Sequence, residues 1–245
     1  MLHRLFARRR SIKDASTKGD SVGPELNAFD RETLTLVRPY TMTSPQRVQA
    51  LILATRYVAR RRIAGAFVEC GVWRGGSMLA AARTLRDAGD VTRELYLFDT
   101  FSGMPEPGPE DVRAHDGAAA SALLRKPGED RTRAEASLDT VKATMNLAGY
   151  DAARVHYVVG KVEQTIPAAA PPAIALLRLD TDWYESTRHE LEHLFPRLAS
   201  GGVLIIDDYG WWAGARRAVD EYFGAHEAPI LLNIIDDTGR IGVRT

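Results

Sequence analysis

Short apolar runs and helix-like patterns alternate along most of this chain. Five runs of mainly apolar residues predict buried strands, at 66–72, 95–99, 155–159, 173–180 and 202–207. Apolar positions three and four residues apart predict helices at 44–62, 77–88, 137–148, 186–198 and 213–223. Apolar strands that alternate with helices are typical of a parallel sheet covered on both sides. The predicted fold class is α/β: a Rossmann-like, doubly wound sheet with helices on both faces.

The two ends of the chain depart from this alternation. Late runs at 230–235 and 241–244 lie close in sequence, and we expect an antiparallel C-terminal hairpin on an otherwise mostly parallel sheet. Residues 1–35 are expected to be a partly irregular arm, and residues 36–245 a single domain. Within that domain, the polar stretch at about 103–135 is rich in proline and glycine, which predicts a lid-like insertion.

Acidic residues stand where the predicted parallel strands end. Glu69 lies at the end of the first strand and Asp99 at the end of the second, while Asp180 and Asp207 close the fourth and fifth. In open α/β sheets, ligands bind outside the carboxyl ends of the strands. We therefore expect most of the chemistry at one edge of the sheet.

The turn after the first strand contains Gly71, Gly75 and Gly76. A nucleoside ligand needs a close approach of the backbone, which glycine permits, and Asp99 is placed to accept hydrogen bonds from ribose hydroxyls. The spacing G-x-x-x-G-G lacks the first close pair of the dinucleotide pattern G-x-G-x-x-G. Glu69 repels a pyrophosphate but suits the ammonium of a methionine, so the pattern favours S-adenosylmethionine over NAD. The alternative is that these glycines only ease helix–strand packing beside a chance aspartate.

Four aspartates form a second group, Asp180, Asp182, Asp207 and Asp208, at the ends of two strands that we expect to be neighbours. Carboxylates held close together repel one another. A hard divalent cation resolves the repulsion, and a set of oxygen ligands with retained waters suits Mg²⁺. The alternative is a set of caps and partial salt bridges, for example between Asp182 and Arg188.

One motif is predicted to be misleading. Residues 189–193 match the zinc protease pattern H-E-x-x-H. The apolar stripe of the predicted helix includes Leu191 and Leu194, so His189 and His193 should face solvent on the opposite side. No G-x-x-H continuation follows, and zinc hydrolysis is disfavoured.

Three aromatic residues each have two possible roles. Trp211 and Trp212 follow the Asp207–Asp208 pair, where they either wall an acceptor pocket or pack in the core. His115 lies in the lid-like insertion, where it is either a base or contact for the acceptor or, as we favour, a plain surface histidine.

Composition narrows the class of protein further. Lys+Arg and Asp+Glu both number 32, so the formal net charge is zero and no nucleic-acid partner is expected. The single cysteine, Cys70, allows no intramolecular disulfide and is expected to pack as a small hydrophobe. No apolar run is long enough to cross a bilayer, and the arginine-rich start lacks the apolar centre of a secretory signal. These features predict a cytoplasmic protein with no membrane partner.

Five strings of residues together resemble the macrocin O-methyltransferase family, of the TylF, MycF and NovP type. They are YTMTS at 40–44, FVECGVWRGGS at 67–77, LFDTFSGMP at 97–105, LRLDTDWYEST at 177–187 and IDDY at 206–209. The resemblance runs from about residue 38 to 225. It implies a Mg²⁺-dependent, S-adenosylmethionine-dependent class I methyltransferase that acts on sugar hydroxyls of macrolide or aminocoumarin natural products.

The resemblance also implies roles for individual residues. The cofactor would contact the following residues: Thr41, Met42, Thr43, Glu69, Gly71, Trp73, Gly75, Ser77 and Asp99. Metal would be bound by Asp180, Asp207 and Asp208. The segment from Glu69 to Ser77 is also similar to catechol O-methyltransferase, whose lysine base falls here on Trp183. The candidate base is therefore Asp182, or Asp180 while it binds metal.

Other functions remain open at this stage. A metal-independent small-molecule methyltransferase would use a plain aspartate base. A non-catalytic nucleoside-binding protein would bind the cofactor without turnover, and an NAD dehydrogenase is disfavoured by the glycine spacing. The expected partner is a small glycoside or sugar acceptor. A homo-oligomer is also expected, since the basic N-terminal arm is suited to mediate assembly.

Overall fold

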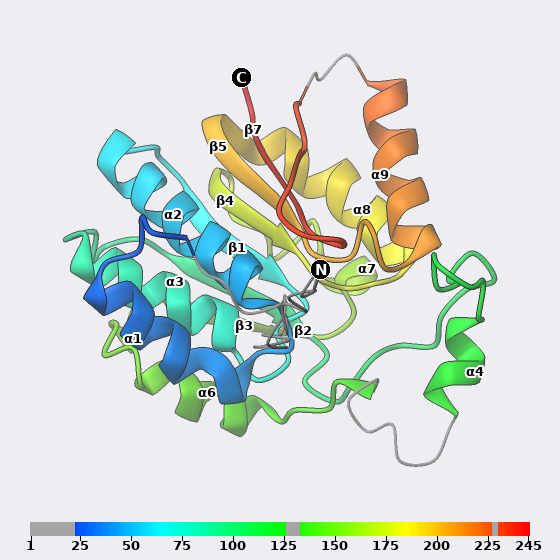
Figure 1. Cartoon of the computed structure of the whole chain (residues 1–245), viewed down its shortest axis with the longest axis horizontal. Helices are drawn as coiled ribbons and strands as arrows, with labels where there is room; N and C mark the ends of the chain where they lie inside the picture. The colour runs from blue at the N-terminus through cyan, green and yellow to red at the C-terminus, as the bar shows by residue number, and fades with distance from the viewer. Residues whose placement is uncertain (1–22, 126–132, 227–229) are drawn as a thin grey trace, which may run out of the picture.

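The computed structural model describes residues 23–125, 133–226 and 230–245. Its centre is a seven-stranded sheet in the order β3-β2-β1-β4-β5-β7-β6 (Figure 1). The strands are β1 Ala66–Cys70, β2 Leu95–Asp99, β3 Val155–Val159, β4 Ile174–Leu179, β5 Leu198–Ile206, β6 Asn233–Ile234 and β7 Arg240–Val243. Strands β1 to β5 are parallel, whereas β7 pairs antiparallel with both β5 and β6. The predicted α/β class, the mostly parallel sheet and the antiparallel hairpin are confirmed.

Helices cover both faces of the sheet. They are α1 Ala28–Val37, α2 Pro45–Arg61, α3 Gly76–Asp87, α4 Ala120–Leu124, α6 Leu138–Asn146, α7 Val162–Thr165, α8 Tyr184–Leu194 and α9 Ala213–Ala225. Helices α1, α2, α3 and α6 lie on one face, and α7, α8 and α9 on the other (Figure 1). Successive strand residues point to opposite faces, so Phe67 packs in the first core and Val68 in the second. Both layers therefore hold the strand ends rigidly.

Some boundaries differ from the predicted ones. Helix α1 crosses the predicted end of the arm at residue 35, because Asn27 and Asp30 form a capping box that starts a helix there. Helix α8 ends at Leu194 rather than at 198, since Pro196 lies in a short 3₁₀ turn and Leu198 already begins β5. The division into arm and domain stays a prediction, and residues 1–22 lie outside the described residues.

The insertion is attached to the rest of the domain by several hydrogen bonds. The indole Nε1 of Trp183 donates to the carbonyl of Pro105 at 3.0 Å, and the amide of Ala114 donates to the carbonyl of Trp211 at 2.8 Å. Asp111, 2% exposed, accepts from the amide of Tyr184 at 2.8 Å, at the start of α8. The described part of the insertion is thus a docked wall beside the carboxyl edge of the sheet.

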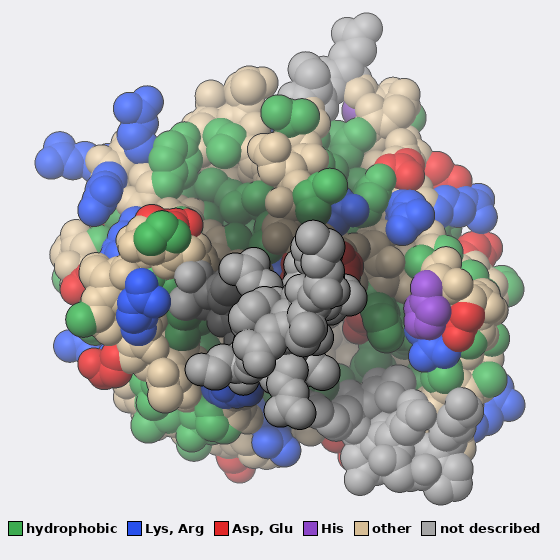
Figure 2. All heavy atoms as spheres, in the orientation of Figure 1, with side chains coloured by type: hydrophobic (Ala, Val, Ile, Leu, Met, Phe, Trp, Pro, Cys, Tyr) green, Lys and Arg blue, Asp and Glu red, His purple; other side chains and the backbone are tan. Residues whose placement is uncertain are grey.

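The surface shows no concentration of one charge on the face in view. Basic and acidic side chains are interspersed around its rim (Figure 2). Among the residues that the structure describes, no helix combines the length and the apolar composition that a membrane span requires.

Candidate functional site

A cavity of about 530 Å³ opens at the carboxyl edge of the sheet, where the sequence predicts the chemistry. Most of the predicted residues line it: Thr41, Met42, Thr43, Gly71, Trp73, Ser77, Asp99, Asp180, Asp182, Asp207 and Asp208. Two predicted cofactor residues do not. Gly75 faces helix α6, since a Cβ there would meet the Val141 side chain at 3.2 Å. Glu69 is buried behind the cavity, at 1% exposure.

The glycine turn is shaped first by packing against β4. Gly71 has φ +81°, and a Cβ there would lie 2.0 Å from the carbonyl oxygen of Asp180. Only glycine fits such a backbone contact. The packing role that the sequence left as an alternative is therefore present in the structure, and it brings the turn directly beside the first aspartate of the acidic group.

The carboxylate of Asp99 is fixed in this turn. Its Oδ2 accepts hydrogen bonds from the amides of Val72 at 2.7 Å and Trp73 at 3.1 Å, and its Oδ1 accepts from the amide of Phe101 at 2.7 Å. A carboxylate offers about four acceptor positions. Its Oδ1 also accepts from the hydroxyl of Thr100, at 3.5 Å, so Asp99 lines the cavity with a carboxylate held by four hydrogen bonds, of which this one is the longest.

Backbone pairing places the acids of neighbouring strands side by side. The amide of Asp180 donates to the carbonyl of Cys70, and the amide of Asp207 to that of Leu179, each at 2.9 Å. One oxygen from each of Asp180, Asp207 and Asp208 lies within 4.8 Å of the other two. The cluster that the sequence predicts is thus formed, and it is the set of aspartates expected to bind metal.

Two arginines that the sequence analysis did not single out balance this acidic group. Arg178, 3% exposed, donates to Glu69 at 2.7 Å, to Asp180 at 2.7 Å and to Asp207 at 2.6 Å. Arg47 contacts the carboxylate of Asp207 from helix α2. A charged residue inside the apolar strand β4 was a usable sequence signal for Arg178. No local pattern marks Arg47.

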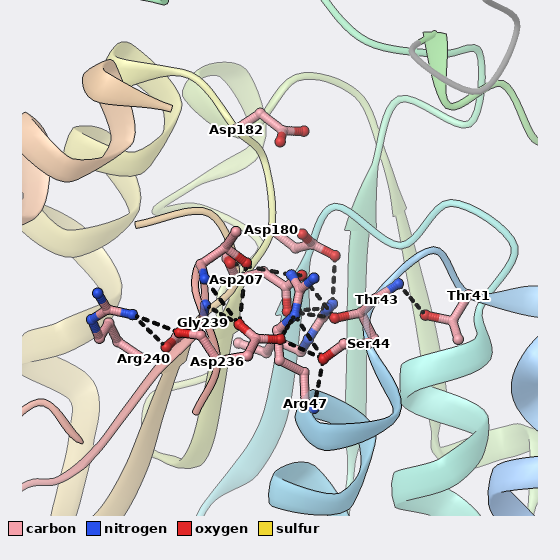
Figure 3. Close-up of polar contacts among 12 residues, drawn as sticks. Thr41, Thr43, Ser44, Arg47, Asp180, Asp182, Asp207, Asp236, Gly239 and Arg240 are labelled. Carbon is pink, nitrogen blue, oxygen red and sulfur yellow. Dashed lines mark hydrogen bonds and ion pairs between the residues drawn. The ribbon is translucent and has the colours of Figure 1, made fainter. Parts of the chain in front are cut away.

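Arg47 also joins the acidic group to the C-terminal hairpin. Its Nε donates to Asp236 at 3.0 Å, although these residues are 189 positions apart. Asp236 accepts from Ser44 as well, and Thr43 donates to Asp207 at 3.0 Å (Figure 3). The segment before α2 and the hairpin turn therefore enclose the cluster from one side.

Two carboxylates of the cluster lie in surroundings that disfavour their charged form. Burial, opposed by Arg178, raises the pKa of Asp180, and burial and neighbouring acids raise the pKa of Asp208. The Oδ2 atom of Asp208 is buried and has no hydrogen-bond partner among the described residues. An unpartnered oxygen in a group of three carboxylates is the donor set that Mg²⁺ prefers. These residues fit a divalent cation.

Asp182 follows Asp180 by two residues and takes no part in the contacts drawn in Figure 3. Its Oδ1 accepts from the indole Nε1 of Trp212 at 2.8 Å. Burial, followed by the charge of Asp180, raises its pKa to about 7. The alternative pairing with Arg188 is wrong, because Arg188 binds Glu185 and Glu192 on the surface of its own helix. Asp182 is left to face the cavity.

The two tryptophans take different positions. Trp212 is 4% exposed and packs edge-on against Trp183 at 5.1 Å, whereas Trp211 is 41% exposed; both line the cavity. The exposed ring of His115 lies 5.7 Å from Trp211, outside the cavity lining. Met104 and Leu123 of the insertion complete an apolar wall.

The family model of macrocin O-methyltransferases matches residues 6–241. The chain belongs to this family. It is 34% identical over 206 residues to the 8-demethyl-8-(2,3-dimethoxy-alpha-L-rhamnosyl)-tetracenomycin-C 4'-O-methyltransferase of Streptomyces olivaceus, covering 82% of this chain and 74% of that protein. It is 31% identical over 208 residues to the demethyldecarbamoylnovobiocin O-methyltransferase of Streptomyces niveus, covering 84% and 76%. The chain is accordingly an O-methyltransferase.

Structural comparison agrees with this membership. The solved structure of the O-methyltransferase NovP superposes with a TM-score of 0.72 at 30% sequence identity, covering 84% of this chain and 82% of that one. The calicheamicin methyltransferase CalS11, at 21% identity and a TM-score of 0.64, shares the fold. The predicted resemblance to the macrocin O-methyltransferase family is therefore confirmed.

In this macrocin O-methyltransferase family member, the residues of the H-E-x-x-H motif are not part of the group of potential metal ligands. The aspartates are the only group of potential metal ligands in the described part of the chain. His189 and His193 contact each other edge-on, with ring centroids 4.4 Å apart, and are half-buried, so the expectation that they face solvent is met only in part. The segment after α7 contacts His189, whose Nε2 lies 3.0 Å from the carbonyl oxygen of Ile166.

Proposed function

We propose that this protein transfers the methyl group of S-adenosylmethionine to a sugar hydroxyl of a glycosylated natural product, with Mg²⁺ bound to Asp180, Asp207 and Asp208. One observation carries the proposal: a single cavity joins the glycine turn and Asp99 to the aspartate cluster. The donor and the acceptor hydroxyl can therefore meet without crossing bulk solvent.

The relatives support a glycoside acceptor. The Streptomyces olivaceus protein is named for a rhamnosyl tetracenomycin, and a Micromonospora griseorubida protein, 32% identical over 187 residues, is named for the 3''-O position of mycinamicin III. The apolar wall of Met104, Leu123 and Trp211 suits the hydrophobic aglycone of such a molecule. The acidic cluster lies on another side of the same cavity and suits the hydroxyl-rich sugar.

The residues of the turn would hold the donor. S-adenosylmethionine supplies an electrophilic methyl group when bound. Asp99 accepts hydrogen bonds from its ribose, and the narrow turn at Gly71 lets the backbone approach it. The segment of Thr41 and Met42 closes over the methionine end. Glu69 lies behind this site. Its Oε1 accepts a hydrogen bond from Arg178, and its Oε2 has no partner among the described residues.

The aspartates would prepare the acceptor. Asp180, Asp207 and Asp208 would hold a divalent cation, which when bound would lower the pKa of an acceptor hydroxyl and fix its position. Asp182 takes the proton, since its pKa of about 7 matches a general base that works near neutrality. Trp212 orients this carboxylate through its indole Nε1. The docked insertion walls the site on one side through Met104 and Leu123.

The proposal is tested by incubating the purified protein with S-adenosylmethionine, Mg²⁺ and a panel of glycosylated natural products together with their aglycones. Mass spectrometry should find one added methyl group on glycosides and none on aglycones. Binding of S-adenosylhomocysteine without any transfer would favour the non-catalytic alternative. Homo-oligomeric assembly and a cytoplasmic location stay predictions.

A further inference from the structure

Glu190, in the middle of helix α8, is a buried acid that belongs neither to the aspartate cluster nor to the glycine turn. Its exposed fraction is 0%, and its Oε1 accepts a hydrogen bond from the hydroxyl of Thr181 at 2.9 Å. Its Oε2 is buried with no hydrogen-bond partner among the described residues. Burying a polar group with so little compensation costs free energy. A purely structural position would be filled at lower cost by an apolar side chain.

The environment disfavours the charged form of this side chain. Burial raises the pKa of Glu190 well above its ordinary value, and the nearby charges of Glu163 and Asp180 raise it further. Cys70 lies beside it at the end of β1, and burial and the charge of Glu190 raise the pKa of that thiol. The hydrogen bond from Thr181 is thus the one that Glu190 makes through its side chain to the acidic turn.

Thr181 stands between two aspartates of the site, Asp180 and Asp182. The backbone turns sharply there: Asp182 has φ +68°, a left-handed conformation that costs free energy for a residue other than glycine. The amide of Trp183 donates to the carbonyl of Thr181 at 2.8 Å, which closes the turn. The hydroxyl of Thr181 donates to the buried Oε1 of Glu190 at 2.9 Å. Its bond to Glu190 ties the turn to helix α8.

We propose that Glu190 is a positioning residue, which acts through Thr181 to hold the turn that presents Asp180 and Asp182 to the acceptor. This inference rests on the proposed function for its catalytic consequence, but not for its structural part. It also gives the H-E-x-x-H motif a use: its glutamate anchors the acidic turn, and its histidines pack against each other.

Paired substitutions separate positioning from simple packing. Glu190→Leu and Thr181→Val remove the hydrogen bond, whereas Glu190→Gln and Thr181→Ser keep an acceptor and a hydroxyl donor. We expect kcat to fall about 10- to 100-fold in the first pair, because small displacements of reacting groups have effects of this size. In the second pair kcat should stay within about threefold of the wild type. The Kd for S-adenosylhomocysteine should not change, since Asp99 and its turn are untouched.

Hydrogen exchange of the Trp183 amide reports on the stability of the same turn and needs no substrate. The amide of Trp183 should exchange faster in Glu190→Leu and Thr181→Val than in the wild type, and at the wild-type rate in Glu190→Gln and Thr181→Ser. Leu194→Ala is the matched control, because it empties a fully buried position of the same helix away from the turn. It should lower the Tm while kcat, measured below the Tm, and the exchange of the Trp183 amide stay unchanged.

The outcomes decide the inference in either direction. Wild-type kcat and exchange in Glu190→Leu would overturn it. So would a Glu190→Gln variant as impaired as Glu190→Leu, because a charge would then be required. If the wild-type protein methylates no acceptor, the proposed function fails, and the exchange pattern still decides whether Glu190 holds the turn: faster exchange in the first pair alone supports it, and equal exchange in all variants contradicts it.

Discussion

Arg178 is the residue on which the buried charges of the site depend. It is the shared partner of Glu69, Asp180 and Asp207, and none of its contacts is longer than 2.7 Å. Removing one member of a buried charge network leaves the others without compensation, which costs far more than losing a surface pair. The stability of the site therefore rests on a cation that the protein itself supplies.

Arg178→Leu should destabilise the protein by about 3–5 kcal/mol, because it leaves buried carboxylates unpaired. Urea unfolding monitored by circular dichroism measures this loss. The control is Arg188→Ala, which removes exposed pairs with Glu185 and Glu192 and should change the free energy of unfolding by less than about 1 kcal/mol. Similar losses of unfolding free energy in both variants would show that the buried network stabilises the protein no more than the exposed pairs do.

Glu69 makes stability depend on pH in a defined direction. Burial raises its pKa to about 7, against the opposing effect of Arg178. The carboxyl group of Glu69 therefore binds its proton more tightly in the folded state than in the unfolded state. This stabilisation is complete below the pKa that Glu69 has in the unfolded state, and it is lost as pH rises through 7. The wild type should lose stability relative to Glu69→Gln between pH 5 and 7, by at most about 1.4 kcal/mol per pH unit. Urea unfolding of both proteins in EDTA measures their difference in unfolding free energy. A difference that stays constant between pH 5 and 7 would refute the prediction.

At the scale of elements, the insertion is positioned by one carboxylate. Asp111 accepts from the amides of Tyr184, at the start of α8, and of Gly108 at 2.7 Å. It also lies against the start of α9, where a Cβ on Gly214 would come within 2.2 Å of its Oδ1. The wall of the acceptor cavity is thus fixed to the two helices that follow the aspartate-bearing strands.

Asp111→Ala should loosen this wall without disturbing the donor site. We expect a loss of about 1–3 kcal/mol in unfolding free energy and a several-fold higher KM for the acceptor, with unchanged binding of S-adenosylhomocysteine. Steady-state kinetics and calorimetry measure both effects. Asp116→Ala, which removes an exposed pair with Arg113 in the same insertion, is the control and should have little effect. An acceptor KM that is equal in the two variants would show that the insertion does not form the acceptor wall.

Element prediction succeeded where the local pattern carries the information. The β3 range was predicted as 155–159 and is Val155–Val159, because an apolar run between polar turns has clear ends. Helix α1 was missed because its apolar stripe is short and its start depends on the capping box at Asn27. The end of α8 was misjudged because its buried stripe continues through Phe195 into β5.

At the scale of the whole molecule, the site could be predicted in part. The topology brings the ends of β1, β2, β4 and β5 to one edge, so acids at strand ends had to meet there. The contact of Arg47 with Asp236 joins segments 189 residues apart and depends on how the C-terminal hairpin returns to the sheet. The burial of Glu190 likewise depends on the turn above it. Such long-range contacts leave no periodic signal in the sequence.

The role of the aspartate cluster is the central claim, and Mg²⁺ dependence of methyl transfer tests it most directly. Protein treated with EDTA is given S-adenosylmethionine and a glycoside acceptor, and the rate is followed as Mg²⁺ is added back, for the wild type and for Asp208→Asn. We expect EDTA to abolish transfer, Mg²⁺ to restore it only in the wild type, and both proteins to bind S-adenosylhomocysteine equally. A full rate of transfer by the wild type in EDTA would contradict the account and identify a metal-independent methyltransferase.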